Sequence, residues 1–165
     1  MDPKTPVAIV VDSAASLPID IDYESQLHVV PMGLTIGGKI YRDGLDLSPT
    51  EFHTVLRKSP TLLSTSAPSP ARFLKTFCRA AEDAQSVLCL TVASRFSASF
   101  DSAENAAQEA EKMLPGVEVV VIDSGSAAGG EGLIALEAWR SARRGNSLSE
   151  VLAHVKVVIQ RVRLL

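Results

Sequence analysis

The sequence lacks the features that mark membrane proteins, nucleic-acid-binding proteins and secreted disulfide-bonded proteins. No apolar run approaches the ~20 residues that a membrane-spanning helix needs, and no secretion signal precedes the first strand-like run. The formal net charge is only −3, with acidic and basic residues interspersed, which argues against a nucleic-acid surface. The two cysteines, Cys78 and Cys89, have no CxxC spacing, so we interpret them as buried thiols and expect a cytoplasmic protein.

Common motifs for metals, cofactors and nucleophilic catalysis are missing as well. The three histidines are widely spaced, without metal-ligand partners nearby in sequence, and no GxSxG pattern occurs. The run GEGLIA at 130–135 matches a loose GxGxxA fingerprint, but no further strand follows to complete a dinucleotide-binding unit. Glu131 stands where a phosphate-binding loop would need lysine. We therefore expect no cofactor and no metal, and we attribute these glycines to a close strand–helix connection.

What the sequence does contain is typical of one globular α/β domain. Its 165 residues are 46% apolar and 21% charged, enough to bury a core. Nearly all-apolar strand-like runs alternate with helical segments, which predicts a mainly parallel sheet with helices on both faces. A further strand with a proline in it, at 28–36, leads through Gly37 and Gly38 into a hairpin. The main predicted strands are 7–11, 86–92 and 117–122, and the predicted helices are 49–58, 70–84, 97–114, one reaching 144, and one from 148 onward.

Polar side chains follow the predicted strands where those strands end. Asp12 and Asp123 each end a strand and are each followed by serine, and Ser94 and Ser97 follow the strand between them. Ligands of open parallel sheets bind at the carboxyl ends of the strands, so we expect these groups on one edge. The stretch LLSTSAPSP at 62–70 is a second hydroxyl-rich segment, placed before a helix. Spacing alone favours an ordinary loop with a helix cap there, whereas the second serine cluster after the strand 86–92 favours the alternative, an anion site built from hydroxyls and backbone N–H groups.

Several segments together resemble the DegV family of bacterial fatty-acid-binding proteins. The segment 64–69, STSAPS, is similar to the family's TSQPS turn, with alanine in place of glutamine. The segment 93–100, ASRFSASF, is similar to its SSxLSGTY segment. The other matching segments are 10–18 (VVDSAASLP), 29–32 (VVPM), 41–44 (YRDG) and 121–132 (VIDSGSAAGGEG).

The resemblance implies a lipid carrier that is not itself an enzyme. Members of the family bind one fatty acid, whose carboxylate is hydrogen-bonded by a threonine and a serine. At the matching positions of this sequence these are Thr65 and Ser97, with Ser66 and Ser94 as helpers. The resemblance also implies a partner, a fatty-acid kinase that phosphorylates the carboxylate with ATP, and no cofactor beyond the bound lipid.

Two departures from the family pattern qualify this expectation. Ala98 and Ser99 replace the family's glycine and threonine beside the expected head group. Family members also continue into a second domain of roughly a hundred residues, so we expect residues 1–165 to form a single domain without that C-terminal one. Such a domain would leave an apolar groove open, which favours homo-oligomers or loose lipid binding.

Two other functions remain open at the level of sequence. The first is a phosphate- or carboxylate-handling enzyme that uses Asp12 or Asp123 for acid–base chemistry at the same edge. The second is an interaction module that binds no ligand and serves only assembly. Capping of the following turn is the simpler explanation of both aspartates.

Overall fold

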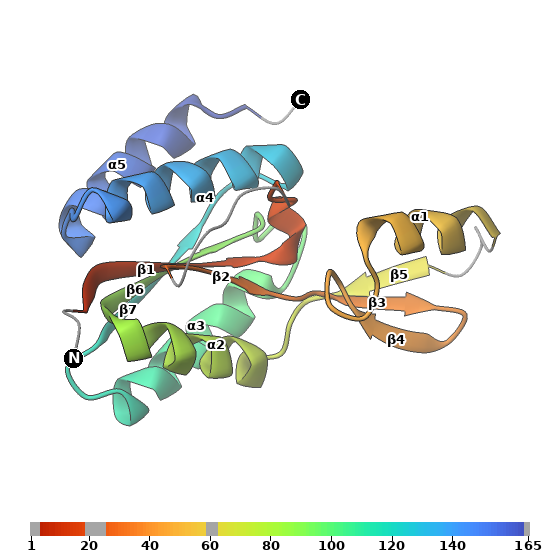
Figure 1. The fold of residues 1–165 in the computed structure, drawn as a ribbon, viewed down its shortest axis with the longest axis horizontal. Coiled ribbons are helices and arrows are strands. Elements are labelled where there is room, and N and C mark those ends of the chain that lie inside the picture. The colour runs from red at the N-terminus through yellow and green to blue at the C-terminus, as the bar shows by residue number, and fades with distance from the viewer. Residues whose placement is uncertain (1–3, 19–25, 59–62, 164–165) are drawn as a thin grey trace.

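A four-stranded parallel sheet forms the centre of the protein. The computed structural model describes residues 4–18, 26–58 and 63–163. In this part of the chain the sheet has the order β2-β1-β6-β7, with all neighbours parallel (Figure 1). The fold class predicted from sequence is therefore confirmed. The strands are β1 (Thr5–Asp12), β2 (Leu27–Val30), β6 (Ala84–Thr91) and β7 (Glu118–Asp123).

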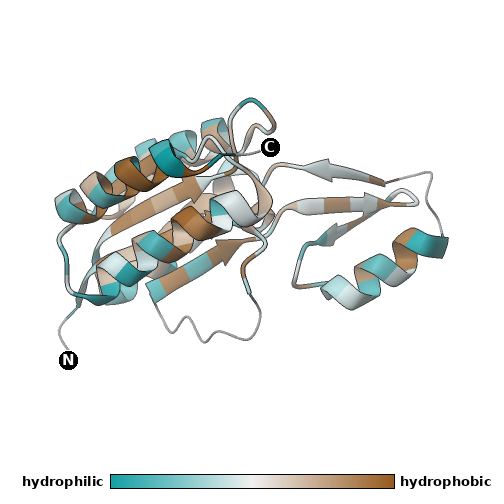
Figure 2. Ribbon diagram, turned by 90° about the horizontal axis from the view of Figure 1, so that it is seen from above, coloured by the Kyte–Doolittle hydropathy of each residue, from teal (hydrophilic) through white to brown (hydrophobic). Residues whose placement is uncertain are grey.

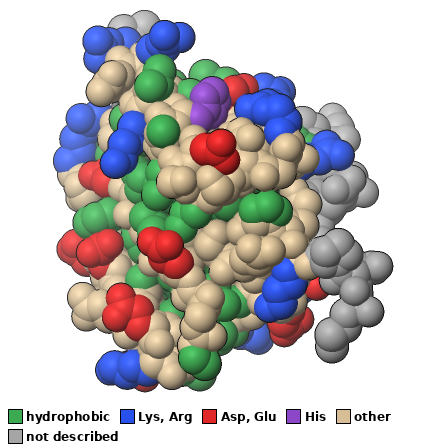
Figure 3. Space-filling view, turned by 90° about the vertical axis from the view of Figure 1, so that its left-hand side faces the viewer, with side chains coloured by type: hydrophobic (Ala, Val, Ile, Leu, Met, Phe, Trp, Pro, Cys, Tyr) green, Lys and Arg blue, Asp and Glu red, His purple; other side chains and the backbone are tan. Residues whose placement is uncertain are grey.

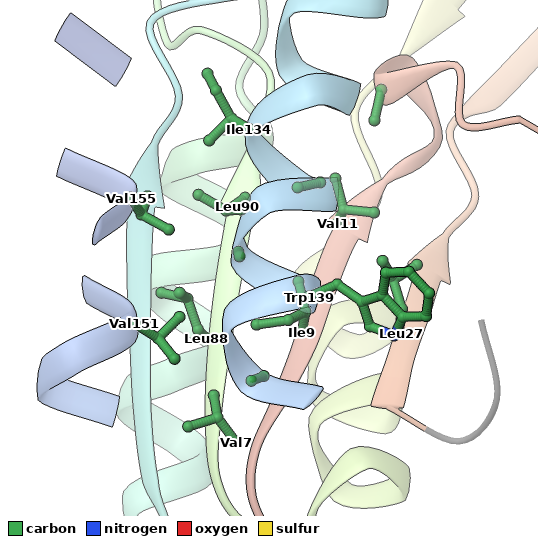
Figure 4. Packing of buried hydrophobic residues seen from close by; sticks show 14 of the residues in the cluster. Val7, Ile9, Val11, Leu27, Leu88, Leu90, Ile134, Trp139, Val151 and Val155 are labelled. Atoms are coloured by element: carbon green, nitrogen blue, oxygen red, sulfur yellow. The ribbon is translucent and has the colours of Figure 1, made fainter. Parts of the chain in front are cut away.

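Helices cover both faces of this sheet, because side chains of alternate residues point to opposite faces. Val7, Ile9 and Val11 pack under the helices α4 (Ala128–Arg143) and α5 (Leu148–Arg161), as Figure 4 shows. Ala8 and Val10 pack against the other pair of helices, α2 (Pro70–Asp83) and α3 (Ser99–Met113). Both faces of β1 are thus dry, as its continuous apolar sequence predicts. We call this sheet with its four helices the body.

A smaller unit projects from one end of the body. It contains an antiparallel sheet of order β4-β3-β5 and the helix α1 (Figure 1). Its strands are less hydrophobic than those of the body, as their paler colour in Figure 2 shows. We call this unit the lobe. Its elements are β3 (Gly33–Ile36), β4 (Lys39–Arg42), β5 (Leu63–Ser66) and α1 (Pro49–Lys58).

The predicted hairpin is confirmed, whereas the single strand at 28–36 is wrong. Gly37 and Gly38 both have positive φ, 57° and 81°, as a tight hairpin turn requires. The chain leaves the first sheet after Val30 and enters the second at Gly33. Pro31, which has no N–H to give to a ladder, lies between the two strands. The proline marks the point where the chain changes from one sheet to the other.

Most other predicted bounds shift by one or two residues, and α3 begins at Ser99 rather than at Ser97, but two differences are larger. Residues 63–66 form β5, so the hydroxyl segment is a strand rather than a loop, while Leu62 lies outside the described residues. Helix α4 begins at Ala128, so the glycines at 129, 130 and 132 belong to its first turns rather than to a connection. The predicted start of α2 at Pro70, with Ser69 as N-cap, is confirmed.

The expectations drawn from composition concerned surface charge, membrane-spanning helices and cysteines. The face of the body farthest from the lobe carries acidic and basic side chains side by side around scattered hydrophobic ones (Figure 3). Across the described ranges, no helix combines the length and apolar character needed to cross a membrane. Cys78 is half-buried and Cys89 is buried, and both are free thiols.

Candidate functional site

The ends of β1, β6 and β7 are joined into one edge by hydrogen bonds between their loops. Asp12 Oδ2 accepts from the backbone N–H of Val92 at 3.0 Å, which links the end of β1 to the end of β6. The N–H of Ala93 in turn donates to the carbonyl of Ser126 at 2.8 Å, beyond β7. The sequence-based expectation that these strand ends share one edge is confirmed for Asp12, Asp123 and the segment that carries Ser94 and Ser97.

Ser97 lies in the turn that leads into α3 and is half-buried. Its Oγ accepts from the backbone N–H of Ser99 at 3.2 Å and lies 3.0 Å from Ser99 Oγ. The backbone bond fixes the Ser97 oxygen without using its proton. The hydroxyl can therefore donate to a ligand that reaches this edge.

Ser94 is also at this edge, but its donor groups are engaged. Its hydroxyl donates to Asp123 Oδ2 at 2.6 Å, and its N–H donates to the same oxygen at 3.2 Å. Asp123 Oδ1 accepts from Gly125 N–H at 2.8 Å. Burial raises the pKa of Asp123, but these hydrogen bonds and the charge of Arg95 outweigh it, so the pKa is lower than usual. Asp123 is thus an ionised cap of the turn that follows β7.

Thr65 and Ser66 lie on β5 in the lobe, and neighbouring residues of a strand face opposite sides. Thr65 pairs with Leu34, and Ser66 pairs with Gly33. The Ser66 hydroxyl lies directly over Gly33, where any Cβ would collide with it. Thr65 therefore faces the other side of the small sheet. Within the described residues, no hydrogen bond joins Thr65 to Ser97, so the four predicted hydroxyls form two pairs, one on the lobe and one on the body.

A buried acidic pair beneath the edge is the feature that sequence reasoning missed. Asp12 and Glu131 are both 0% exposed. Burial, then the charge of Asp12 and its contact with the Glu131 carboxyl, raise the pKa of Glu131 to about 9. The pKa of Asp12 is also raised, chiefly by burial. Two adjacent carboxyl groups in a dry site cannot both ionise readily, so at neutral pH the pair holds one proton.

The signal for Glu131 was present in the sequence but ambiguous. The GEG tripeptide looked like part of a loose cofactor fingerprint, and its glycines serve packing instead. A Cβ on Gly132 would collide with the carbonyl of Ala15, and one on Gly130 would collide with Ser126 Oγ. Helix α4 consequently lies against the 3₁₀ turn after β1 (Ser13–Ala15), which brings Glu131 to Asp12.

A hollow of about 550 Å³ lies between the end of β1 and the lobe. Its lining is mostly apolar, and the Ser13 hydroxyl bridges its two sides by donating to Asp43 Oδ2 at 2.7 Å. Sequence reasoning could not find it, because four stretches of the chain, 12–17, 29–31, 43–45 and 49–53, come together to form it. Neither Thr65 nor Ser97 lines this hollow. The apolar lining is made by Ala15, Leu17, Val29, Pro31, Leu45, Pro49 and Phe52.

The carboxylates at this edge serve as caps of the turns that follow the strands. In the ranges that the structure describes, no three His, Cys, Asp or Glu side chains come together as metal ligands would. The oxygens of Asp12 and Asp123 accept from backbone N–H groups, as turn caps do. The chemistry on offer at the edge is hydrogen-bond donation to an anion.

The fold and edge define a class of protein: an α/β domain whose parallel sheet ends in hydroxyl-bearing turns. Residues 6–165 match the family model named "Uncharacterised protein, DegV family". A DegV domain-containing protein of Caldanaerobacter subterraneus is 33% identical over 157 residues, which are 95% of this chain and 54% of the relative. This chain belongs to the DegV family.

Solved structures show the same similarity. A Thermus thermophilus structure named "Fatty Acid Binding of a DegV family Protein" is 35% identical, with a TM-score of 0.80 over 94% of this chain and 54% of that one. A stearic acid-binding protein of Eubacterium ventriosum is 28% identical, with a TM-score of 0.80 over 91% of this chain and 52% of that one. The chain thus spans about half the length of the relatives it matches.

Proposed function

We propose that this chain binds a long-chain fatty acid and presents its carboxylate to a partner fatty-acid kinase. The observation that carries the proposal is membership of the DegV family, together with 35% identity to a structure named for fatty-acid binding. The edge geometry supports it, because Ser97 has an oxygen fixed by a backbone N–H and a hydroxyl proton that this backbone bond does not use. In this proposal the chain is a carrier rather than a catalyst.

The proposed head-group contacts come from both units of the molecule. Thr65 on the lobe and Ser97 on the body donate to the carboxylate, and Ser66 and Ser94 assist. Ser94 can assist only by giving up its 2.6 Å bond to Asp123, and Ser66 faces away from Thr65 on β5. We therefore expect Thr65 and Ser97 to contribute more than the two helpers.

The acyl tail and the carboxylate head group of the fatty acid would contribute differently to the free energy of binding. Burying about fifteen methylenes at ~0.8 kcal/mol each gives roughly 12 kcal/mol before costs. Hydrogen bonds to a charged carboxylate add about 1.5–3 kcal/mol each, less the desolvation of the ion. The tail would therefore set the affinity, while the hydroxyls would set the orientation that a kinase needs.

The first experiment is native mass spectrometry of the purified chain, followed by organic extraction and lipid analysis. One fatty acid per chain would support the proposal and show that these 165 residues suffice for binding. An empty protein that also fails to take up added palmitate would overturn it for this chain.

The site assignment is tested by comparing palmitate with methyl palmitate, which has the same tail without the charge. We expect Thr65→Ala and Ser97→Ala each to weaken palmitate binding about tenfold and to leave the ester unaffected. Ser64→Ala, also on β5, is the matched control. Equal affinity of the unsubstituted chain for acid and ester would contradict the assignment.

The kinase partnership is tested by adding a bacterial fatty-acid kinase and ATP to the loaded chain. A carboxylate oxygen of the lipid would attack the γ-phosphorus of ATP, giving acyl phosphate and ADP. We expect product only when chain, kinase and ATP are all present. Product formed equally well without the chain would show that it does not present the lipid.

A further inference from the structure

Beneath Ser97, three buried polar side chains connect the edge of the sheet to the first turn of α4. Ser99, Asp12 and Glu131 are each 0% exposed. Burying polar side chains away from water lowers the stability of the fold unless they have partners. We therefore looked for a function that would explain their burial. None of them was among the expected ligand contacts.

Asp12 is the fixed member of this group. Its Oδ1 accepts from Ala14 N–H at 3.0 Å and its Oδ2 accepts from Val92 N–H at 3.0 Å. With both oxygens held by backbone, the carboxylate cannot rotate. Its remaining lone pairs face the Ser99 hydroxyl and the Glu131 carboxyl, both of which favour its ionised form.

Ser99 connects Asp12 to Ser97. An ionised carboxylate can only accept, and the Ser99 hydroxyl lowers the pKa of Asp12 as a hydrogen-bond donor does, so we infer that its proton points at Asp12. Ser99 Oγ then lies 3.0 Å from Ser97 Oγ as an acceptor, and the Ser99 N–H holds the Ser97 oxygen at 3.2 Å. An incoming carboxylate is a stronger acceptor than Ser99 Oγ, so the Ser97 proton turns to it without movement of the oxygen.

Glu131 is the second side chain that interacts with the Asp12 carboxyl. Neither of its oxygens accepts a hydrogen bond from a donor in the described part of the chain, and the group it faces is the Asp12 carboxylate. Its carboxyl is nevertheless close enough for the charge of Asp12 to act on it strongly. A neutral acid there leaves a single buried charge, on Asp12, whereas a second charge would repel it.

We propose that Ser99 and the buried pair of Asp12 and Glu131 are positioning residues, which hold the Ser97 hydroxyl where a carboxylate ligand meets it. This inference rests on the proposed function. It differs from the family pattern noted in the sequence, because it gives Ser99, which replaces the family's threonine, a role through Ser97 rather than on the lipid.

The groups that face Glu131 decide how the arrangement responds to pH. Asp12 lies on β1, Asp123 ends β7, and Cys89 lies on β6. Burial, then the charges of Asp12 and Glu131, raise the pKa of the Cys89 thiol well above its usual range, so it stays neutral. Ionisation of Glu131 near pH 9 is therefore the change we expect to disturb Asp12 and, through it, Ser97.

The test measures palmitate and methyl palmitate affinity for four variants against the unsubstituted chain. We expect Ser99→Ala to weaken palmitate binding about fivefold to tenfold and to leave the ester within twofold. Exposed Glu104→Ala, on the same helix, is the control and should change neither. A purely structural role of Ser99 would weaken both ligands equally and would overturn the inference.

Glu131→Gln and Glu131→Ala complete the test, because glutamine keeps a neutral donor of the same length. At pH 7, Glu131→Gln should bind palmitate within twofold of the unsubstituted chain, whereas Glu131→Ala should weaken it about fivefold. Between pH 8 and 10 the unsubstituted chain should lose palmitate affinity, and Glu131→Gln should not. A pH profile that is the same for both would contradict the inference.

The outcomes separate this inference from the proposed function. If Ser97→Ala weakens palmitate alone while Ser99→Ala and the Glu131 variants have no effect, the positioning role fails and the lipid site stands. If the unsubstituted chain binds no palmitate, both proposals fail together.

Discussion

The body and the lobe are built on opposite principles. In the body, every strand lies in a parallel sheet covered by helices, and all residues of β1 are buried except Thr5 and Pro6, which are half-buried. In the lobe, all four residues of β5 are exposed, and α1 buries none of its residues. The lobe is held together by hairpin ladders and two buried side chains of β3, Leu34 and Ile36, rather than by a core of its own.

The difference matters because the proposed head-group contacts are shared between the two units. The Ser97 oxygen is held by a hydrogen bond from the backbone N–H of Ser99 in the body, whereas Thr65 lies on an exposed strand of the lobe. A ligand that both residues contact would tie the less stable unit to the more stable one. Ligand binding should therefore stabilise the lobe more than the body.

The largest effect should come from removing a core ring of the body. Phe77 is 0% exposed and packs beside Phe73. We expect Phe77→Ala to lower the free energy of unfolding by about 3–5 kcal/mol, measured by urea denaturation. Phe52→Ala, which removes a half-buried ring of α1, should cost at most ~1 kcal/mol. Equal losses would show that lobe and body share one core.

The second effect is a pH dependence of folding stability, which arises from Glu131 in the body. The pKa of Glu131 is about 9 in the folded protein against an ordinary value of 4.5, so the folded state keeps a proton that the unfolded chain releases. Stability should therefore fall as pH rises from about 4.5 towards 9. Relative to Glu131→Gln, the unsubstituted chain should lose roughly 2–4 kcal/mol between pH 5 and 8.

Urea denaturation at several pH values measures this difference directly. Glu111→Gln, on the exposed surface of α3, is the control and should follow the unsubstituted chain. Parallel curves for the chain and Glu131→Gln would mean that Glu131 is already ionised at pH 5.

The third effect separates two glycines of α4. Glycine to alanine in a helix usually stabilises by about 0.5–1 kcal/mol, and Gly129→Ala should do so because nothing lies within 4 Å of the added Cβ. Gly132→Ala should instead cost about 1–3 kcal/mol, since its Cβ would strike the Ala15 carbonyl. Thermal unfolding of the two variants measures the sign, and a gain for both would disprove the close approach of α4 to the turn after β1.

The smallest effect compares two similar helix caps in the two units. Ser147 and Glu150 form a capping box at α5, and Ser48 and Glu51 form the same contacts at α1. We expect Ser147→Ala to cost about 1 kcal/mol of global stability. Ser48→Ala should leave global stability unchanged and speed amide hydrogen exchange only within α1. A global loss from Ser48→Ala would mean that the lobe unfolds together with the body.

The sequence predicted the body better than the lobe for a physical reason. Apolar strands such as 7–11 are recognisable because burial on both faces demands a continuous apolar run. β5 offered no such signal, because its exposed residues Ser64 to Ser66 are the hydroxyls typical of a loop. Pro31 indicated an interruption, but only the three-dimensional pairing shows that two sheets meet there.

The candidate site was predictable only in part. Strand ends and family motifs singled out Ser94, Ser97, Thr65 and Ser66, but not which hydroxyl protons are already used. Ser94 donates to Asp123, a contact between residues 29 apart in sequence. The burial of Glu131 was not predicted, because an acidic residue in the first turn of a helix usually faces water. Its burial follows from the approach of Gly132 to Ala15, which no local pattern encodes.

The pairing of β1 with β6 also constrains the order in which the chain can fold. Thr5 pairs with Ala84, 79 positions later, so the central ladder closes a long loop that contains β2 and the whole lobe. The hairpin of β3 and β4 closes over two residues and can form within microseconds. During synthesis, β1 must remain without its β6 neighbour until residue 84 has emerged. The apolar strand β1 thus lacks one of its two neighbours until β6 has been made, and we expect slow, chaperone-sensitive maturation of the sheet.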